Sequence, residues 1–292
     1  MTQPGQDDRH VDVSLVRRLL AAQFPEWADL PVRPVDADGR DNSIFRLGAD
    51  LGVRLPRREL GARHLDAEIR WLPVLAPHLP LPVPEPVGRG VPSAEYPWHW
   101  AVTRWLPGAV AALEPVRDEA RTADELARFL AALRAVDPQG GPPSHLRGRP
   151  LAERDAAVRT AIAATTDSEP AALTAVWESA LAAPPWSGAG GWTHGDLHPA
   201  NLLVVGGRLS AVLDFGLLGV GDPAVDVVVA WTVLSPPARE HFRAASGTDE
   251  ATWRRARGRA LGFGLMCAHA CAGSLVGRIG RRTVDQVLAD RR

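Results

Sequence analysis

Three polar residues in the second half of the chain stand at spacings that constrain its fold. Asp196 and Asn201 are five residues apart in a string that reads Trp-Thr-His-Gly-Asp-Leu-His-Pro-Ala-Asn, and Asp214 begins an Asp-Phe-Gly triplet. Between them, two apolar stretches flank Gly206-Gly207, which predicts two short strands joined by a hairpin. A hairpin returns the chain to its starting point, so we expect the three side chains to converge on one site.

The first third of the chain is rich in strand signals. The predicted elements are helices over 11–24 and 60–75 and strands over 43–47, 51–55 and 98–106. The second of these helices carries Glu68. The proline-dense stretch 73–97 is predicted to be extended, because proline fixes φ and disfavours helical conformation in the residue before it.

The rest of the chain is mostly helical. The predicted elements are helices over 118–136, 151–164, 171–183, 223–234 and 252 to the end, and strands over 201–205 and 209–213. A strand-rich part followed by a helix-rich part predicts an α+β protein of two lobes. We expect an antiparallel-sheet N-terminal lobe over residues 1–106 and a larger helical C-terminal lobe over 107–292, with a ligand between them.

Each of the three polar residues suits one role in phosphoryl transfer, a reaction that needs positioning and charge neutralisation more than covalent help. Asp196 is placed to accept the proton of a substrate hydroxyl. Asn201 offers an amide oxygen and Asp214 a carboxylate, and hard oxygen ligands of this kind suit Mg²⁺. Their order and spacing are those of a kinase catalytic loop and its metal-binding Asp-Phe-Gly.

The chain resembles the aminoglycoside phosphotransferase family, the small-molecule relatives of protein kinases. The string His-Gly-Asp-x-x-x-x-Asn at 194–201 carries the resemblance, with Gly195 where protein kinases have Arg, and Val-Gly-Asp-Pro-Ala-Val-Asp at 220–226 adds to it. The resemblance implies a two-lobed, protein-kinase-like fold. It also implies transfer of the γ-phosphate of ATP or GTP to a hydroxyl of a small molecule, such as an aminoglycoside or another antibiotic.

In the first lobe the resemblance implies that four residues bind the nucleotide. Gly39 and Asn42 match a nucleotide-covering turn, Arg54 lies on the next strand and Glu68 on the helix after it. Kinases usually have Lys at the position of Arg54, but this chain contains no lysine. Arginine keeps the positive charge and can bind phosphate oxygens in a fork, although it is bulkier and planar. Because Glu68 follows on a helix, we expect it to pair with Arg54.

Two other functions fit parts of the sequence. A metal-dependent hydrolase could use His194, Asp196 and His198 as alternating ligands, although this leaves Asn201, Asp214 and the first lobe unexplained. A nucleotide-binding pseudokinase that acts as a partner protein is the second alternative, and the retained Asp196 speaks against it.

Two further aspartates follow the Asp-Phe-Gly triplet. We interpret Asp222, together with the proline after it, as the start of a helix, and Asp226 as an internal hydrogen-bond anchor for the loop. Neither is expected to contact the substrate.

Composition limits the partners of the chain. A net charge of −1 gives no sign of nucleic acid or anionic membrane as a partner. The most apolar run, 211–234, is interrupted by three aspartates, which argues against a membrane span. We therefore expect a cytoplasmic monomer or homodimer whose partners are a nucleoside triphosphate and a small hydroxylated substrate. Acidic and basic residues are balanced after Pro107, so global charge does not support a polycationic acceptor.

Overall fold

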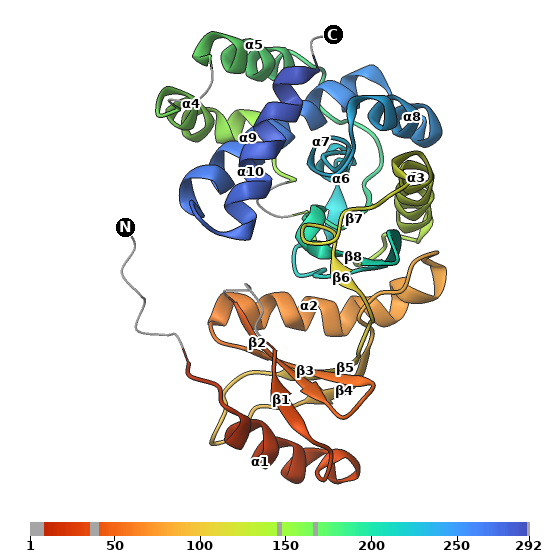
Figure 1. The fold of residues 1–292 in the computed structure, drawn as a ribbon, viewed down its shortest axis with the longest axis vertical. Helices are drawn as coiled ribbons and strands as arrows, with labels where there is room; N and C mark the ends of the chain where they lie inside the picture. The colour runs from red at the N-terminus through yellow and green to blue at the C-terminus, as the bar shows by residue number, and fades with distance from the viewer. Residues whose placement is uncertain (1–8, 36–40, 145–147, 166–168, 291–292) are drawn as a thin grey trace. The chain divides into compact units, whose positions relative to one another are not determined.

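The computed structural model describes residues 9–35, 41–144, 148–165 and 169–290, and it divides into two compact units. Unit 1 comprises Met1–Pro77, Pro82–Pro107 and Asp214–Gly216, and unit 2 comprises His78–Leu81, Gly108–Leu213 and Leu217–Arg292. Unit 1 contains an antiparallel sheet and unit 2 is mostly helical (Figure 1), so the predicted α+β class is confirmed. Within the described residues no helix is long and apolar enough to cross a membrane.

Unit 1 is built on a five-stranded antiparallel sheet. Its strands are β1 (Val32–Pro34), β2 (Asn42–Leu47), β3 (Leu51–Pro56), β4 (Pro86–Gly90) and β5 (Trp100–Arg104), in the spatial order β1-β2-β3-β5-β4. Helix α1 (Val13–Gln23) lies on one side of this sheet and α2 (Glu59–Leu75) on the other, as Figure 1 shows. The helices predicted over 11–24 and 60–75 are confirmed, as are the three predicted strands; β1 and β4 were not predicted.

The alternation of side chains along β3 decides which of them meets α2. Val53 and Leu55 are fully buried in a core that α1 helps to form, so Arg54 between them points to the opposite face. On α2 the buried side chains follow helical spacing and include Leu65, Glu68, Leu72 and Leu75. Glu68 therefore lies on the face of α2 that is turned toward β3.

The prediction of an extended stretch over 73–97 is wrong at its start. Pro73 lies inside α2, and the helix continues to Leu75 before the 3-10 turn Ala76–His78. The last turn carries the fully buried side chains of Leu72 and Leu75, whose packing offsets the backbone hydrogen bond that proline removes. Pro86 begins β4, which is an edge strand and tolerates a missing N–H.

Unit 2 contains most of the helices. They are α3 (Glu119–Ala135), α4 (Asp155–Ala163), α5 (Pro170–Leu181), α6 (Ala224–Val227), α7 (Val229–Thr232), α8 (Pro236–Ser246), α9 (Glu250–Ala270) and α10 (Leu275–Ala289). Its strands are β6 (Ala109–Val110), β7 (Gly191–Thr193), β8 (Leu202–Val205), β9 (Arg208–Val212) and β10 (Gly219–Gly221). The predicted hairpin is present as β8–β9, which β6 extends to three strands, and β7 pairs with β10.

Two helices predicted in unit 2 are broken. The stretch 223–234 forms the two short helices α6 and α7, and the stretch from 252 onward forms α9 and α10. Before α10, Gly273 has a φ of 85° and Ser274 accepts a backbone N–H of the new helix at 3.1 Å, so one helix ends and another is capped. Helix α8 was not predicted, although its first turn begins with proline and it ends at Gly247, whose φ is 59°.

Helix α9 is buried on most sides and contributes one wall of the site described below. It packs closely on α10, where a Cβ added to Gly280 would lie 2.7 Å from the carbonyl oxygen of Gly264. Only glycine allows the two backbones to approach this closely.

Candidate active site

Asp226 of α6 anchors the loop between β7 and β8. Its carboxylate accepts hydrogen bonds from the backbone N–H groups of His194 and Gly195, both at 2.8 Å. Burial raises the pKa of Asp226 to about 6, and the two N–H groups act in the opposite direction. The interpretation of Asp226 as an internal anchor of the loop is confirmed.

Gly195 gives this loop a conformation that other residues rarely adopt. Its φ is 84°, and an added Cβ would lie 2.4 Å from the carbonyl oxygen of Leu217. Both the backbone conformation and the contact with another backbone therefore require glycine immediately before Asp196.

His194 connects the loop to the residue before Asp214. Its Nε2 donates to the carbonyl of Leu213 at 2.9 Å, and its Nδ1 accepts the backbone N–H of Asp196 at 3.2 Å. Because a carbonyl only accepts and an N–H only donates, the ring is neutral with its proton on Nε2. The carbonyl of Asn201 accepts the N–H of Leu213 at 2.8 Å. The loop therefore holds both backbone groups of Leu213, which fixes where the Asp-Phe-Gly triplet begins.

His198 and Asn201 surround the carboxylate and backbone of Asp196. Nδ1 of His198 accepts a backbone N–H from Ala200 at 3.2 Å, and its ring stacks on Phe263 with 5.5 Å between centroids. Nε2 of His198 lies 3.4 Å from a carboxylate oxygen of Asp196. Nδ2 of Asn201 donates to the backbone carbonyl of Asp196 at 2.9 Å. The amide oxygen of Asn201 takes no part in this hydrogen bond.

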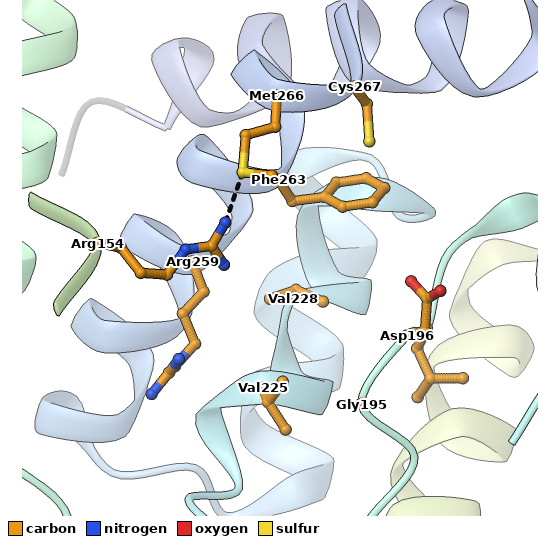
Figure 2. Close-up of a pocket in the computed structure, with 10 residues that line it drawn as sticks. Arg154, Gly195, Asp196, Val225, Val228, Arg259, Phe263, Met266 and Cys267 are labelled. Carbon is orange, nitrogen blue, oxygen red and sulfur yellow. Dashed lines mark hydrogen bonds between the residues drawn. The ribbon is translucent and has the colours of Figure 1, made fainter. Parts of the chain in front are cut away.

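Asp196 lines a hollow within unit 2 that has a cavity volume of about 40 Å³ and opens to solvent. The walls come from the loop after β7, from α6, from α9 and from the 3-10 turn Leu151–Arg154. Figure 2 shows Asp196 on one side of the hollow and Arg154 and Arg259 on the other, with Phe263 at its edge. A hollow of this size admits a few water-sized groups, so one end of a small molecule can reach the carboxylate from solvent.

In unit 1, Arg54 of β3 and Glu68 of α2 form a buried ion pair. Nη1 of Arg54 lies 2.5 Å from Oε2 of Glu68 and Nη2 lies 3.3 Å from Oε1, so the predicted pairing is confirmed. Burial raises the pKa of Glu68 to about 7, and the Arg54 guanidinium opposes this rise. Burial lowers the pKa of Arg54, but the carboxylates of Glu68 and Asp214 outweigh this effect and raise it. Both acidic groups therefore favour the charged form of the guanidinium.

Three other predicted site residues, Asp214, Asn42 and Gly39, belong to unit 1. Asp214 is exposed and has a φ of 60°, an uncommon conformation for a residue with a side chain. Its Oδ1 lies 3.4 Å from the backbone nitrogen of Gly216. Asn42 begins β2, and its buried side-chain oxygen has no hydrogen-bond partner among the described residues. Gly39 lies outside the residues that the structure describes.

The donor atoms fit Mg²⁺ better than a transition metal. Asn201 and Asp214 supply amide and carboxylate oxygens, which Mg²⁺ prefers. His194 uses both ring nitrogens for backbone groups, so it cannot be a metal ligand in this conformation. No group of three or more His, Cys, Asp or Glu side chains suited to a metal occurs in the described part of the chain. The hydrolase alternative thereby loses one of its three ligands.

Arg154, Arg259 and Phe263 line the hollow but were not recognised in the sequence. No motif marks them. The one local signal was a pair of arginines four residues apart, Arg255 and Arg259, inside a long helix rich in glycine and apolar residues. A charge in the buried stripe of such a helix needs a partner, and this requirement could have drawn attention to α9.

An aspartate–asparagine loop bonded to the start of an Asp-Phe-Gly triplet, together with a strand arginine paired to a helix glutamate, defines a kinase-like phosphotransferase. The sequence model described as "Phosphotransferase enzyme family" matches residues 32–259, and the chain belongs to this family. The predicted family and enzyme class are thereby confirmed. No protein of curated function matches the sequence.

Solved structures share the fold over nearly the whole chain. The GDP complex of wild-type aminoglycoside 2'-phosphotransferase-IIIa is 19% identical with a TM-score of 0.75, covering 97% of this chain and 100% of its own. The macrolide 2'-phosphotransferase MphH from Brachybacterium faecium, as apoenzyme, is 26% identical with a TM-score of 0.65, covering 94% and 98%. A ternary complex of aminoglycoside phosphotransferase APH(4)-Ia with AMP-PNP and hygromycin B is 18% identical with a TM-score of 0.62, covering 95% and 99%.

Proposed function

We propose that the protein transfers the γ-phosphate of ATP or GTP to a hydroxyl of a small molecule, with Asp196 as the base. The observation that carries this proposal is the position of Asp196 on the wall of the hollow, in a loop that also holds both backbone groups of Leu213. Solved structures of the same fold include complexes with GDP and AMP-PNP, which supports a nucleotide as the phosphate donor.

In this proposal the acceptor enters the hollow and its hydroxyl donates to the carboxylate of Asp196. As the acceptor oxygen bonds to the γ-phosphorus, the hydroxyl proton passes to Asp196 and the bond to the bridging oxygen breaks, releasing the nucleoside diphosphate. Nε2 of His198 lies 3.4 Å from a carboxylate oxygen of Asp196, close enough to favour the charged carboxylate. Arg54, kept charged by Glu68 and Asp214, contacts the phosphates of the donor.

Asn201 and Asp214 would hold Mg²⁺, whose contribution when bound is to neutralise charge on the phosphate oxygens. The residues 1–106 would then bind the nucleotide, and the residues 107–292 would supply the base and the acceptor site. The amide oxygen of Asn201, whose Nδ2 is bonded to the Asp196 carbonyl, and the carboxylate of Asp214 would be the two ligands that the chain contributes.

The test is phosphate transfer to an acceptor, followed by phosphorus NMR and mass spectrometry of the product. The acceptor panel includes kanamycin, gentamicin, hygromycin B, a macrolide and simple alcohols. Asp196→Asn should reduce turnover by about 10²-fold or more, because the amide cannot take the proton. Asp285→Asn, an exposed position on α10, is the matched control and should keep wild-type turnover.

Three results would contradict the proposal in different ways. Turnover of Asp196→Asn within a few-fold of wild type would exclude Asp196 as the base. Nucleotide binding without transfer to any acceptor would favour the pseudokinase alternative. A tightly bound transition metal in the purified protein, lost in His198→Ala, would favour the hydrolase.

A further inference from the structure

The charges around the hollow are distributed unequally between its two sides. Among the described residues that line it, Asp196 is the one carboxylate, and Arg154 and Arg259 are its two cations. Figure 2 shows both arginines on the side opposite Asp196, with Val225 and Val228 between the two sides and Phe263 and Cys267 above. The hollow therefore has a basic wall, an apolar middle and a catalytic carboxylate.

Arg154 is a partly buried cation bonded to a weak acceptor. Its guanidinium donates to the thioether sulfur of Met266, drawn as the dashed line in Figure 2. Within the described part of the chain no carboxylate forms an ion pair with Arg154. Burial lowers the pKa of its guanidinium, which still remains charged near neutral pH. An anion from outside would restore the solvation that this charge has lost.

Arg259, the second arginine of the hollow, shares the carboxylate of Asp222 with Arg255. Asp222 accepts from Arg259 Nη2 at 3.1 Å, and also from Arg255 Nε at 3.0 Å and Nη2 at 3.1 Å. One carboxylate thus faces two guanidiniums, and Arg154 adds a charge close enough to repel Arg259. This wall carries more positive than negative charge.

A polycation is a poor match for this wall. Ammonium groups need carboxylates or carbonyl oxygens around them, and two guanidiniums would repel them in a partly desolvated hollow. A neutral alcohol would fit the apolar middle, yet it would leave the Arg154 charge without an ionic partner.

We propose that the acceptor is a hydroxylated acid with an apolar body. Its hydroxyl would lie at Asp196, its apolar body against Val228 and Phe263, and its carboxylate or other anionic group at Arg154 and Arg259. This inference rests on the proposed function, because it takes the hollow to be the acceptor site, and it names the class of molecule that the site selects. Arg154 is then a specificity-determining residue.

The test compares three probes of equal length that differ only in the charge of one end. They are 8-hydroxyoctanoic acid, octane-1,8-diol and 8-aminooctan-1-ol, each titrated into the full chain by calorimetry at pH 7.5. We expect the acid to bind about tenfold more tightly than the amine, with the diol between them, in line with one charge-assisted hydrogen bond. Higher salt should reduce the difference.

Variants separate a direct contact from a general effect. Arg154→Gln should weaken binding of the acid about tenfold and leave the diol almost unchanged, and Arg154→Glu should reverse the preference between acid and amine. Arg159→Gln removes another arginine of the same unit, from the exposed surface of α4, and should change none of the three affinities. Thermal unfolding of each variant checks that the fold is intact.

The inference fails if the amine binds as tightly as the acid or more tightly, if the acid does not bind detectably, or if Arg154→Glu keeps the preference for the acid. Phosphate transfer to the amino alcohol in preference to the hydroxy acid would overturn the inference and leave the proposed phosphotransferase intact. Arg154-dependent binding of the acid without transfer to any acceptor would support the basic wall and count against the proposed function.

Discussion

Removing the guanidinium of Arg54 would leave the Glu68 carboxyl buried without its partner. Glu68 is 1% exposed and is contacted by both terminal nitrogens of Arg54. Breaking a buried ion pair from one side costs about 3–5 kcal/mol when the remaining group stays charged. When that group is neutral, only a hydrogen bond of about 1 kcal/mol is lost. The cost of Arg54→Met therefore depends on the protonation of Glu68.

The pKa of Glu68 gives the sign of this dependence. Burial raises it from 4.5 to about 7 in the folded protein, although Arg54 opposes the rise. The folded state thus holds this proton more tightly than the unfolded state, and the stability it contributes is present below pH 4.5 and is lost as the pH rises through 7. Without Arg54 the pKa rises further, so the loss continues above pH 7 in Arg54→Met.

Denaturant unfolding of wild type, Arg54→Met, Glu68→Gln and the double variant at pH 5 and 8.5 measures the effect. We expect Arg54→Met to cost about 1 kcal/mol at pH 5 and about 3 kcal/mol at pH 8.5. At pH 8.5 the double variant should cost about 2 kcal/mol less than the sum of the single variants. Equal costs at both pH values, or strict additivity, would refute the argument. Arg54→Ala should raise the KM for the nucleotide. Arg54→Lys should reverse part of this rise, because it restores the positive charge but not the two-pronged contact of a guanidinium with phosphate.

Three other changes test the remaining parts of the site. Asp214→Ala should abolish the enhancement of ATP binding by Mg²⁺ more than binding itself, and a mutant that keeps the wild-type enhancement in calorimetry would exclude Asp214 as a ligand. Gly195→Ala should lower kcat and the melting temperature together, because both φ and the Leu217 carbonyl reject a Cβ; an unchanged melting curve would contradict this. Burial raises the pKa of Asp222, but hydrogen bonds and the charges of Arg255 and Arg259 outweigh burial and lower this pKa below its ordinary 3.8. The ionised Asp222 carboxylate therefore stabilises the folded protein above pH 3.8, and this stabilisation is lost as the pH falls further. Asp222→Asn should therefore cost about 3 kcal/mol at pH 7 and progressively less below pH 4, as followed by thermal melting in a pH series.

Local sequence patterns were sufficient where one short segment determines its own structure. The turn at 48–50 between two apolar stretches specifies the β2–β3 hairpin, and strand alternation then places Arg54 opposite Val53 and Leu55. The helical period of α2 places Glu68 on its buried face, so the pair is predictable from two periodicities. The loop string 194–201 places Asp196 and Asn201 in one short loop, where Asn201 donates to the backbone carbonyl of Asp196.

The elements that were missed depend on distant partners. Strands β1 and β4 are short, contain proline or glycine and exist because the edges of the sheet pair with them. Pro73 remains helical because Leu72 and Leu75 of the same turn are buried. In each case tertiary packing outweighs the local preference. The residues that make the deciding contact lie far away in the sequence, so a local pattern does not include them.

The charge of the hollow depends most strongly on contacts between residues that are distant in the sequence. The chain contains 33 arginines and no lysine, so an arginine at any one position carries little information. Acidic and basic residues are nearly equal in number, and they remain balanced after Pro107. Only the packing of α9 against the turn at Arg154 shows that one guanidinium meets a thioether while two others share Asp222. The motif residues indicate the reaction, whereas the acceptor charge that we propose follows from Arg154, with which no described carboxylate forms an ion pair.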